Sequence, residues 1–228
     1  MQSTRLLAVC VGVAAAAVAQ LAWAEKAAPT AASATVTTPA LASEVDASTP
    51  QKLIETTARA MMRDIEANRP LYRKDPMQLY ALVDRILLPY FDVDYAARLV
   101  LGRHWRAATP EQRKRFVEAF YRSLLTNYST ALVEFTSDRL KILPAAVEAG
   151  GQAASVRSDV KRRNGQKVPV SYSMRLTPQG WKAWDVVIEG ISYVKSFRED
   201  FGAEIDQKGL DAVLERLERQ AGAPARKP

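Results

Sequence analysis

The 228-residue sequence carries 32 Lys and Arg against 25 Asp and Glu, a formal net charge of +7, with one histidine and one cysteine. These counts exclude a disulfide framework, a cysteine-ligated metal and a histidine-rich metal cluster, so an ordinary packed core has to stabilise the fold. The positive balance suits nucleic acid, anionic lipid headgroups or acidic proteins as partners, and it also suits a merely solvated surface.

The first 24 residues have the three parts of an export signal. Arg5 precedes an apolar run over residues 6–19, and residues 22–24 form a small-x-small cleavage site. A retained anchor is the alternative, but the run is rich in alanine and a glutamine follows it, whereas a membrane span needs about 20 strongly apolar residues. We therefore expect cleavage before Glu25, loss of Cys10 with the signal, and an exported, periplasmic protein without a nucleic-acid partner.

The rest of the chain is predicted to be one domain between two flexible segments. Residues 25–48 are rich in Ala, Thr, Ser and Pro and predict a flexible linker. Residues 49–220 are expected to form a single α+β domain, and residues 221–228 a disordered tail. The signal contains one charged residue, Arg5, so its removal lowers the net charge by one, to +6.

Four helices are predicted in the first half of the domain. Apolar residues recur with helical period over residues 49–70, 75–89, 92–101 and 109–135. Pro70 is expected to end the first helix and Gly102 the third. The fourth begins with a capping box from Thr109 to Gln112. Its large apolar residues lie on a single stripe.

The pattern then changes from helical period to alternation. Strands are expected over residues 140–143, 154–161, 167–176 and 183–189, with a hairpin at Asn164-Gly165 and a turn over 178–180. A last amphipathic helix is expected over residues 210–219. Helices followed by an antiparallel meander with one apolar face predict an α+β fold, with the helices packed on one face of the sheet.

Few residues are available for catalysis. His104 precedes Trp105 in an expected loop, where a structural contact suits it better than a catalytic role, and no nucleophile elbow, phosphate loop or dinucleotide fingerprint is present. Carboxylates remain as candidates, with Asp92 and Asp94 as one pair and Asp185 and Glu189 as the other. Asp92 is better explained as a helix cap, while Asp185 and Glu189 are expected on the polar face of the sheet. We expect no enzymatic activity and no cofactor.

Two stretches resemble the MlaC family, also described as Ttg2-type toluene-tolerance auxiliary proteins. One runs from Phe91 through residues 97–106 to Phe116, and the other is residues 184–194 with Arg198 and Phe201. The resemblance covers about residues 53–217, nearly the whole predicted domain. The sequence departs from the family pattern at two aromatic positions, which are occupied by His104 and Phe197.

The resemblance implies an NTF2-like fold, with helices on one face of a curved antiparallel sheet that encloses an apolar cavity. It also implies a periplasmic phospholipid carrier that maintains outer-membrane lipid asymmetry. The partners implied are an outer-membrane lipoprotein–porin complex and an inner-membrane ABC transporter with an MCE domain. A neighbouring branch of the family is associated with hopanoids, so a hopanoid carrier is the alternative.

We expect the lipid to lie between the fourth helix and the apolar sheet face. The predicted lipid-binding residues are Leu124, Tyr128, Leu132, Phe135, Val156, Val160, Val170, Tyr172, Met174, Trp184, Val186 and Ile188. In the competing interpretation these residues pack against one another in a closed core. Two further functional hypotheses are a carboxylate hydrolase that uses Asp185 and Glu189, and a non-enzymatic periplasmic scaffold whose apolar face docks a protein.

Overall fold

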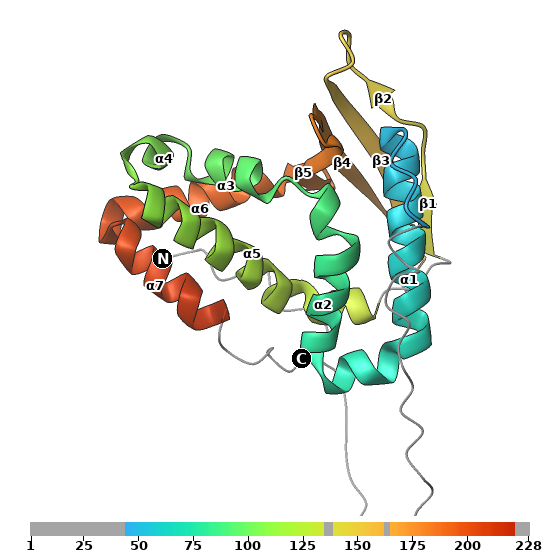
Figure 1. The fold of residues 1–228 in the computed structure, drawn as a ribbon, viewed down its shortest axis with the longest axis horizontal. Helices are drawn as coiled ribbons and strands as arrows, with labels where there is room; N and C mark the ends of the chain where they lie inside the picture. Colours follow the sequence, from blue (N-terminus) through green and yellow to red (C-terminus); the bar gives the residue numbers. More distant parts are fainter. Residues whose placement is uncertain (1–43, 135–138, 162–164, 222–228) are drawn as a thin grey trace, which may run out of the picture. The chain divides into compact units, whose positions relative to one another are not determined.

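The computed structural model describes residues 44–134, 139–161 and 165–221, which all belong to one compact unit (Figure 1). The helices are α1 (Pro50–Lys74), α2 (Pro76–Ile86), the 3-10 turn η2 (Leu88–Tyr90), α3 (Val93–Leu101), α4 (Arg103–Ala107), α5 (Pro110–Val133), α6 (Tyr193–Lys208) and α7 (Leu210–Ala221). The strands are β1 (Leu140–Ile142), β2 (Ala146–Val147), β3 (Ala153–Lys161), β4 (Lys167–Thr177), β5 (Gly180–Ile188) and β6 (Ile191–Ser192). The expected α+β class is confirmed.

Several predictions fall on residues that lie outside the described part of the chain. These are the signal peptide, the linker over residues 25–43, Phe135, Asn164 of the hairpin and the tail from residue 222. The last residues assigned to the linker are described, and they contact the domain. Val45 and Ala47 pack against the buried cluster that contains Leu53 of α1, and Lys52 pairs with Asp46 at 3.0 Å.

Helix starts follow the local sequence closely. The capping box that opens α5 is present, because the Gln112 backbone N–H donates to Thr109 Oγ1 at 3.1 Å and the Thr109 N–H donates to Gln112 Oε1 at 3.0 Å. The carboxylates of Asp75 and Asp92 likewise accept backbone hydrogen bonds at the starts of α2 and α3. Gly102 ends α3 with a φ of 52°.

Three helix predictions needed correction. Pro70 kinks α1 without ending it: the backbone leaves helical geometry at Asn68 (φ −119°, ψ 17°) and the helix then continues to Lys74. The expected loop around His104 is the short helix α4. Helix α6 was not predicted from periodicity, since its three buried residues are separated by many charged positions. Among the described residues, no helix is long and apolar enough to cross a bilayer.

The strands form one antiparallel sheet in the order β1-β3-β4-β5-β6, with β2 beside β3. Across its centre, Val156 of β3 faces Tyr172 of β4, which faces Val186 of β5. The register shifts by one residue next to Met174, so that its partner is Ala183. This bulge makes the predicted alternation wrong at Trp184. Ala183, and not Trp184, shares a sheet face with Val186.

The buried side chains form three clusters. The first joins α3, the first half of α5, α6 and α7, and includes Phe116, Phe120 and Leu214. The second joins α1, α2 and the second half of α5. The third joins Leu53 of α1 to the sheet. Figure 1 shows α5 running from the α6–α7 pair towards α2, so this helix takes part in both helical clusters.

Asp185 links β5 to the start of α6. Its carboxylate accepts hydrogen bonds from Ser192 Oγ at 2.6 Å and from the Val194 backbone N–H at 3.0 Å. Asp185 is paired with Ser173 on the polar face of the sheet, as expected, but it is only 4% exposed. The first turn of α6 therefore removes Asp185 from water, although it lies on the polar face of the sheet.

Replacing Asp185 with Asn should lower the free energy of unfolding by about 2–4 kcal/mol, because a buried charged acceptor of two hydrogen bonds becomes a neutral amide. Urea unfolding followed by circular dichroism measures this loss. The matched control is Asp200→Asn, the same change at an exposed position of α6, which should stay within about 0.5 kcal/mol of wild type. Equal stability of the two variants would contradict the role assigned to Asp185.

Candidate functional site

The candidate site is the sheet face that contacts α1, which we call the inner face. Strand β3 contributes its even-numbered positions from 154 to 160. Strand β4 contributes its even-numbered positions from 168 to 176. One end of this face is tightly packed. Ala154, Met174 and Ala183 are at most 6% exposed and contact the third cluster with Leu53. The described inner-face positions of β3, β4 and β5 carry no charged residue.

The other end of the inner face is apolar but less completely covered. Four residues are only partly buried, although each lies in the same cross-strand row as a buried valine (Val156, Val168 or Val170): Val160, Tyr172, Val186 and Ile188. Among the described residues, Val160, Val170, Val186 and Ile188 belong to none of the three clusters. This part of the inner face is therefore an apolar surface that the described side chains cover only in part.

The predicted lipid-binding residues of α5 are divided between two clusters. Leu124 packs against the first cluster and Leu132 against the second. Tyr128, between them on α5, is 38% exposed, and its ring lies 5.9 Å from that of Tyr193 on α6. Burial raises the pKa of Tyr128 to about 12, with a smaller contribution from Tyr193. Tyr128 thus presents a mainly apolar ring between two packed leucines.

The predicted lipid-binding residues of the sheet and of α5 pack against different clusters. Met174, Val156 and Tyr172 contact the third cluster, whereas the two α5 leucines contact the first and second. Trp184 is the exception, since it packs in the same cluster as Leu124. The structure therefore separates Trp184 from the other predicted sheet residues.

Trp184 helps to attach α3 to the sheet. Its ring lies edge-on to Tyr95, with centroids 5.6 Å apart, and the Arg175 guanidinium lies 4.3 Å from the Tyr95 ring centroid. Arg175 Nε is also 3.0 Å from Asp92 Oδ2. Asp92 caps α3 through Tyr95 N–H at 3.1 Å, so the interpretation of Asp92 as a cap is confirmed.

His104 and Asp185, two of the catalytic candidates, make structural contacts. His104 Nε2 lies 3.4 Å from Asp206, and both oxygens of Asp185 accept hydrogen bonds. Glu189 is an exposed turn residue with a φ of 52°, and it also makes an interaction of its own. Within residues 44–134, 139–161 and 165–221, no group of three or more His, Cys, Asp or Glu is placed to bind a metal ion.

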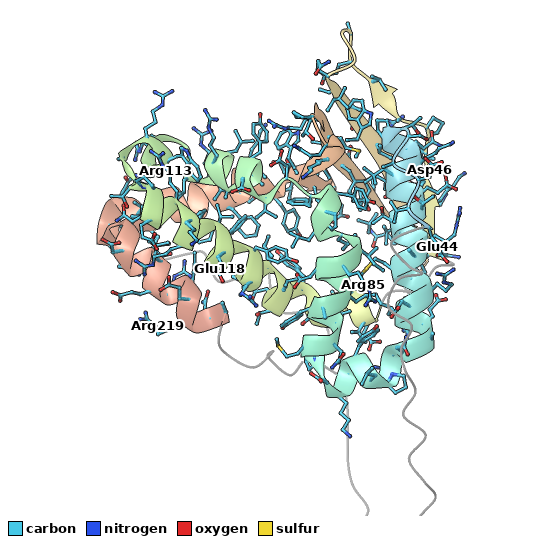
Figure 2. All side chains as sticks on the ribbon, viewed as in Figure 1. Glu44, Asp46, Arg85, Arg113, Glu118 and Arg219 are labelled. Atoms are coloured by element: carbon cyan, nitrogen blue, oxygen red, sulfur yellow. The ribbon has the colours of Figure 1, made fainter. Side chains whose placement is uncertain are left out.

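The motif around Trp105 builds the corner between α4 and α5. Arg113 Nε donates to the Trp105 carbonyl at 2.8 Å, and its guanidinium lies over the Trp105 ring at 5.4 Å. Figure 2 labels Arg113 at this corner, on the opposite side of the molecule from Asp46 beside α1. A surface pocket here is lined by Asp94, Trp105, Pro110, Arg113, Lys114, Val117 and Glu118. Four charged residues make it unsuitable for acyl chains.

Sequence reasoning missed two buried hydroxyl groups. Ser158 lies on the inner face of β3 and Thr57 on the buried side of α1, and neither Oγ has a hydrogen-bond partner among the described residues. Ser158 interrupts the apolar alternation of Val156 and Val160, and this interruption was the signal that could have identified it.

Comparison with known proteins gives consistent matches. The family model for MlaC protein matches residues 55–219. The toluene tolerance protein ttg2D of Pseudomonas putida is 34% identical over 168 residues, which cover 73% of this chain and 78% of that protein. The intermembrane phospholipid transport system binding protein MlaC of Haemophilus influenzae is 24% identical over 178 residues, which cover 77% of this chain and 83% of that protein.

A solved structure supports the fold. The phospholipid-binding protein from Ralstonia solanacearum, determined in complex with a phospholipid, superposes with a TM-score of 0.68 at 25% identity. The match covers 75% of this chain and 96% of that one. Since the family model spans most of the chain and the Pseudomonas putida relative is 34% identical over 168 residues, this protein belongs to the MlaC family.

Proposed function

We propose that this protein is a periplasmic phospholipid carrier that shelters acyl chains against the inner face of its sheet. The observation that carries the proposal is the apolar surface around Val186 and Ile188, which the described side chains leave partly uncovered. The proposal is supported by the Ralstonia solanacearum neighbour, a protein of the same fold that contains a phospholipid. In this assignment Tyr128 of α5 lies at the side of the bound chains.

The energetics of lipid transfer require such a surface. Each CH₂ group exposed to water costs about 0.8 kcal/mol, and the two chains of a phospholipid carry on the order of 30 such groups. A carrier has to provide an environment about as apolar as the bilayer. It does not have to bind more strongly than the bilayer, so half-buried valine, isoleucine and tyrosine side chains suffice.

The place of this carrier in the cell follows from its predicted export. We propose that it receives and delivers lipid at an outer-membrane lipoprotein–porin complex and an inner-membrane MCE-domain ABC transporter, and so maintains outer-membrane lipid asymmetry. The name of the Haemophilus influenzae relative, a binding protein of an intermembrane phospholipid transport system, supports this role. The excess of basic residues suits transient contact with acidic surfaces of such complexes.

Native mass spectrometry of the protein purified from a bacterial periplasm tests the proposal. A stoichiometric phospholipid, identified after extraction, is the expected result. A bound hopanoid would replace the phospholipid in the proposal. Protein that is empty and also takes up no lipid from vesicles would contradict the carrier function and favour a scaffold or a carboxylate hydrolase.

Replacing Ile188 with Arg should reduce co-purified phospholipid at least about tenfold, because a cation then lies on the proposed lipid surface. The cost in stability should be about 1 kcal/mol, since Ile188 belongs to no packed cluster and a long side chain can reach water. Lipid analysis and thermal unfolding of the same preparation measure both effects.

The contrasting variant is Met174→Arg on the same face. Met174 is 1% exposed and packed in the third cluster, so this change should lower the free energy of unfolding by about 4 kcal/mol or more. Met77→Arg, at a 60% exposed position of α2 away from the inner face, should preserve both fold and lipid. Retention of lipid by the Ile188 variant would argue against the inner face as the lipid surface.

The titration of Tyr128 reports on its surroundings. Its pKa of about 12 lies above the ordinary value of 10.0, because the folded protein favours the neutral phenol. The stabilisation that the neutral phenol gives is complete below pH 10, and it is lost as the pH rises from 10 towards 12. In an absorbance titration, the difference between wild type and Tyr128→Phe should have a midpoint near 12. A midpoint near 10 would place the phenol in water.

A further inference from the structure

One end of the sheet combines the less covered part of the inner face with an excess of cations. Strand β3 ends and β4 begins at this end, and β5 ends and β6 begins there as well, because neighbouring strands are antiparallel. We call it the turn end. The partly buried Val160 and Ile188 lie in the two inner-face rows nearest to it, whereas the tightly packed Met174 lies towards the opposite end. The proposed lipid surface therefore extends to the turn end.

Ile191 continues the inner face to the edge of the sheet. It is the cross-strand partner of Ile188, and residues paired in this way point to the same face. Its side chain is 62% exposed, the largest value for a large apolar residue in the described part of the chain. The apolar row from Val170 through Ile188 thus ends in a side chain that projects into water.

Four cations lie around this apolar edge. Lys161 and Lys167 face each other in the last pair of the β3–β4 ladder, and both are exposed. Lys195 is exposed in the first turn of α6, directly after β6, and Arg139 directly precedes β1 at the same end of the sheet. None of the four makes an ion pair with a carboxylate within residues 44–134, 139–161 and 165–221.

The acids near the turn end do not balance these cations. Glu189 lies in the turn between β5 and β6, and Asp159 faces Lys141 of β1 on the polar face of the sheet. Like charges directly opposite each other, such as Lys161 and Lys167, destabilise an antiparallel pair. An anionic partner outside the chain would offset this repulsion.

We propose that the turn end contacts an anionic lipid bilayer while a phospholipid enters or leaves the inner face. Ile191 inserts between the headgroups, and the surrounding cations lie against their phosphates. A bilayer suits this end better than a folded protein, because three of the four cations are lysines, whose flexible ammonium groups suit mobile phosphates more than fixed carboxylates. The inference rests on the proposed carrier function and names the surface through which lipid is exchanged.

Vesicle flotation tests the contact. Protein purified from a bacterial periplasm is mixed with vesicles of phosphatidylcholine, or of phosphatidylcholine and phosphatidylglycerol in equal amounts, and the floated fraction gives the partition coefficient. Wild type should bind the phosphatidylglycerol vesicles at least about tenfold more strongly, and added salt should remove the difference.

Two variants should weaken the contact for different reasons. Lys161→Gln combined with Lys167→Gln should lower partitioning onto phosphatidylglycerol vesicles at least about tenfold, because each cation near an anionic surface contributes about fivefold. Ile191→Ser should lower it by about tenfold, because the inserted apolar side chain is lost. Thermal unfolding provides the check on folding: Lys161→Gln removes one of two facing like charges, so this variant should be at least as stable as wild type.

The matched control removes two exposed cations elsewhere. Arg106→Gln combined with Lys114→Gln changes the α4–α5 corner and should leave partitioning within about twofold of wild type, because attraction to a charged surface falls off within about a Debye length. An equal loss in this control and in the Lys161 and Lys167 variant would overturn the assignment to the turn end.

Lipid analysis of the same preparations separates this inference from the carrier function. Wild type that contains a phospholipid but floats equally with both kinds of vesicle would overturn the bilayer contact and leave the carrier function intact. If the Lys161 and Lys167 variant were then depleted of lipid in the periplasm, its cations would be assigned to an acidic protein partner. Flotation of wild type that neither contains nor takes up phospholipid would instead overturn the carrier function, and with it the exchange of lipid at this end.

Discussion

The partly uncovered inner face of the sheet is the constraint on which the rest of the structure depends. Apolar side chains stabilise a fold by about 25 cal/mol for each Å² removed from water, so a half-buried surface contributes only part of what a closed core would. The three clusters supply the remaining burial away from this surface. Helix α5 joins the two helical clusters, because its first half packs in one and its second half in the other.

Polar contacts attach the helices to β4 and β5 without filling the inner face. At one position Arg175, Asp92 and Tyr95 join the start of α3 to the sheet. At another, the Asp185 carboxylate holds the start of α6. Hydrogen bonds and ion pairs are directional, so they set the position of a helix end that apolar packing alone would leave less defined. The bulge at Trp184 supports the first of these contacts, because it turns the indole towards Tyr95.

The residues that identify the family and the residues proposed to bind lipid have different roles. The motif around Trp105 and Arg113 builds the α4–α5 corner, where particular side chains make particular contacts. The inner face needs only apolar residues of suitable size, and these are interchangeable at small cost. This difference fits a structural match of TM-score 0.68 at only 25% identity. The fold is maintained by many weak preferences and a few specific contacts.

Local sequence was sufficient for the features that depend on neighbouring residues. The capping box at Thr109, the cap at Asp92, the stop at Gly102 and the main strands could all be predicted, because their contacts lie within a few positions along the chain. The family, too, was recognisable from the sequence alone.

Only the tertiary structure decided how these elements use their side chains. The bulge moved Trp184 off the inner face, and the first turn of α6 buried Asp185, although both residues alternate normally in the sequence. The division of the α5 stripe between two clusters and the unpartnered hydroxyl of Ser158 likewise depend on segments far apart in the chain. A periodic pattern specifies which side chains are apolar, but burial and partners are set by the elements that come to lie against them.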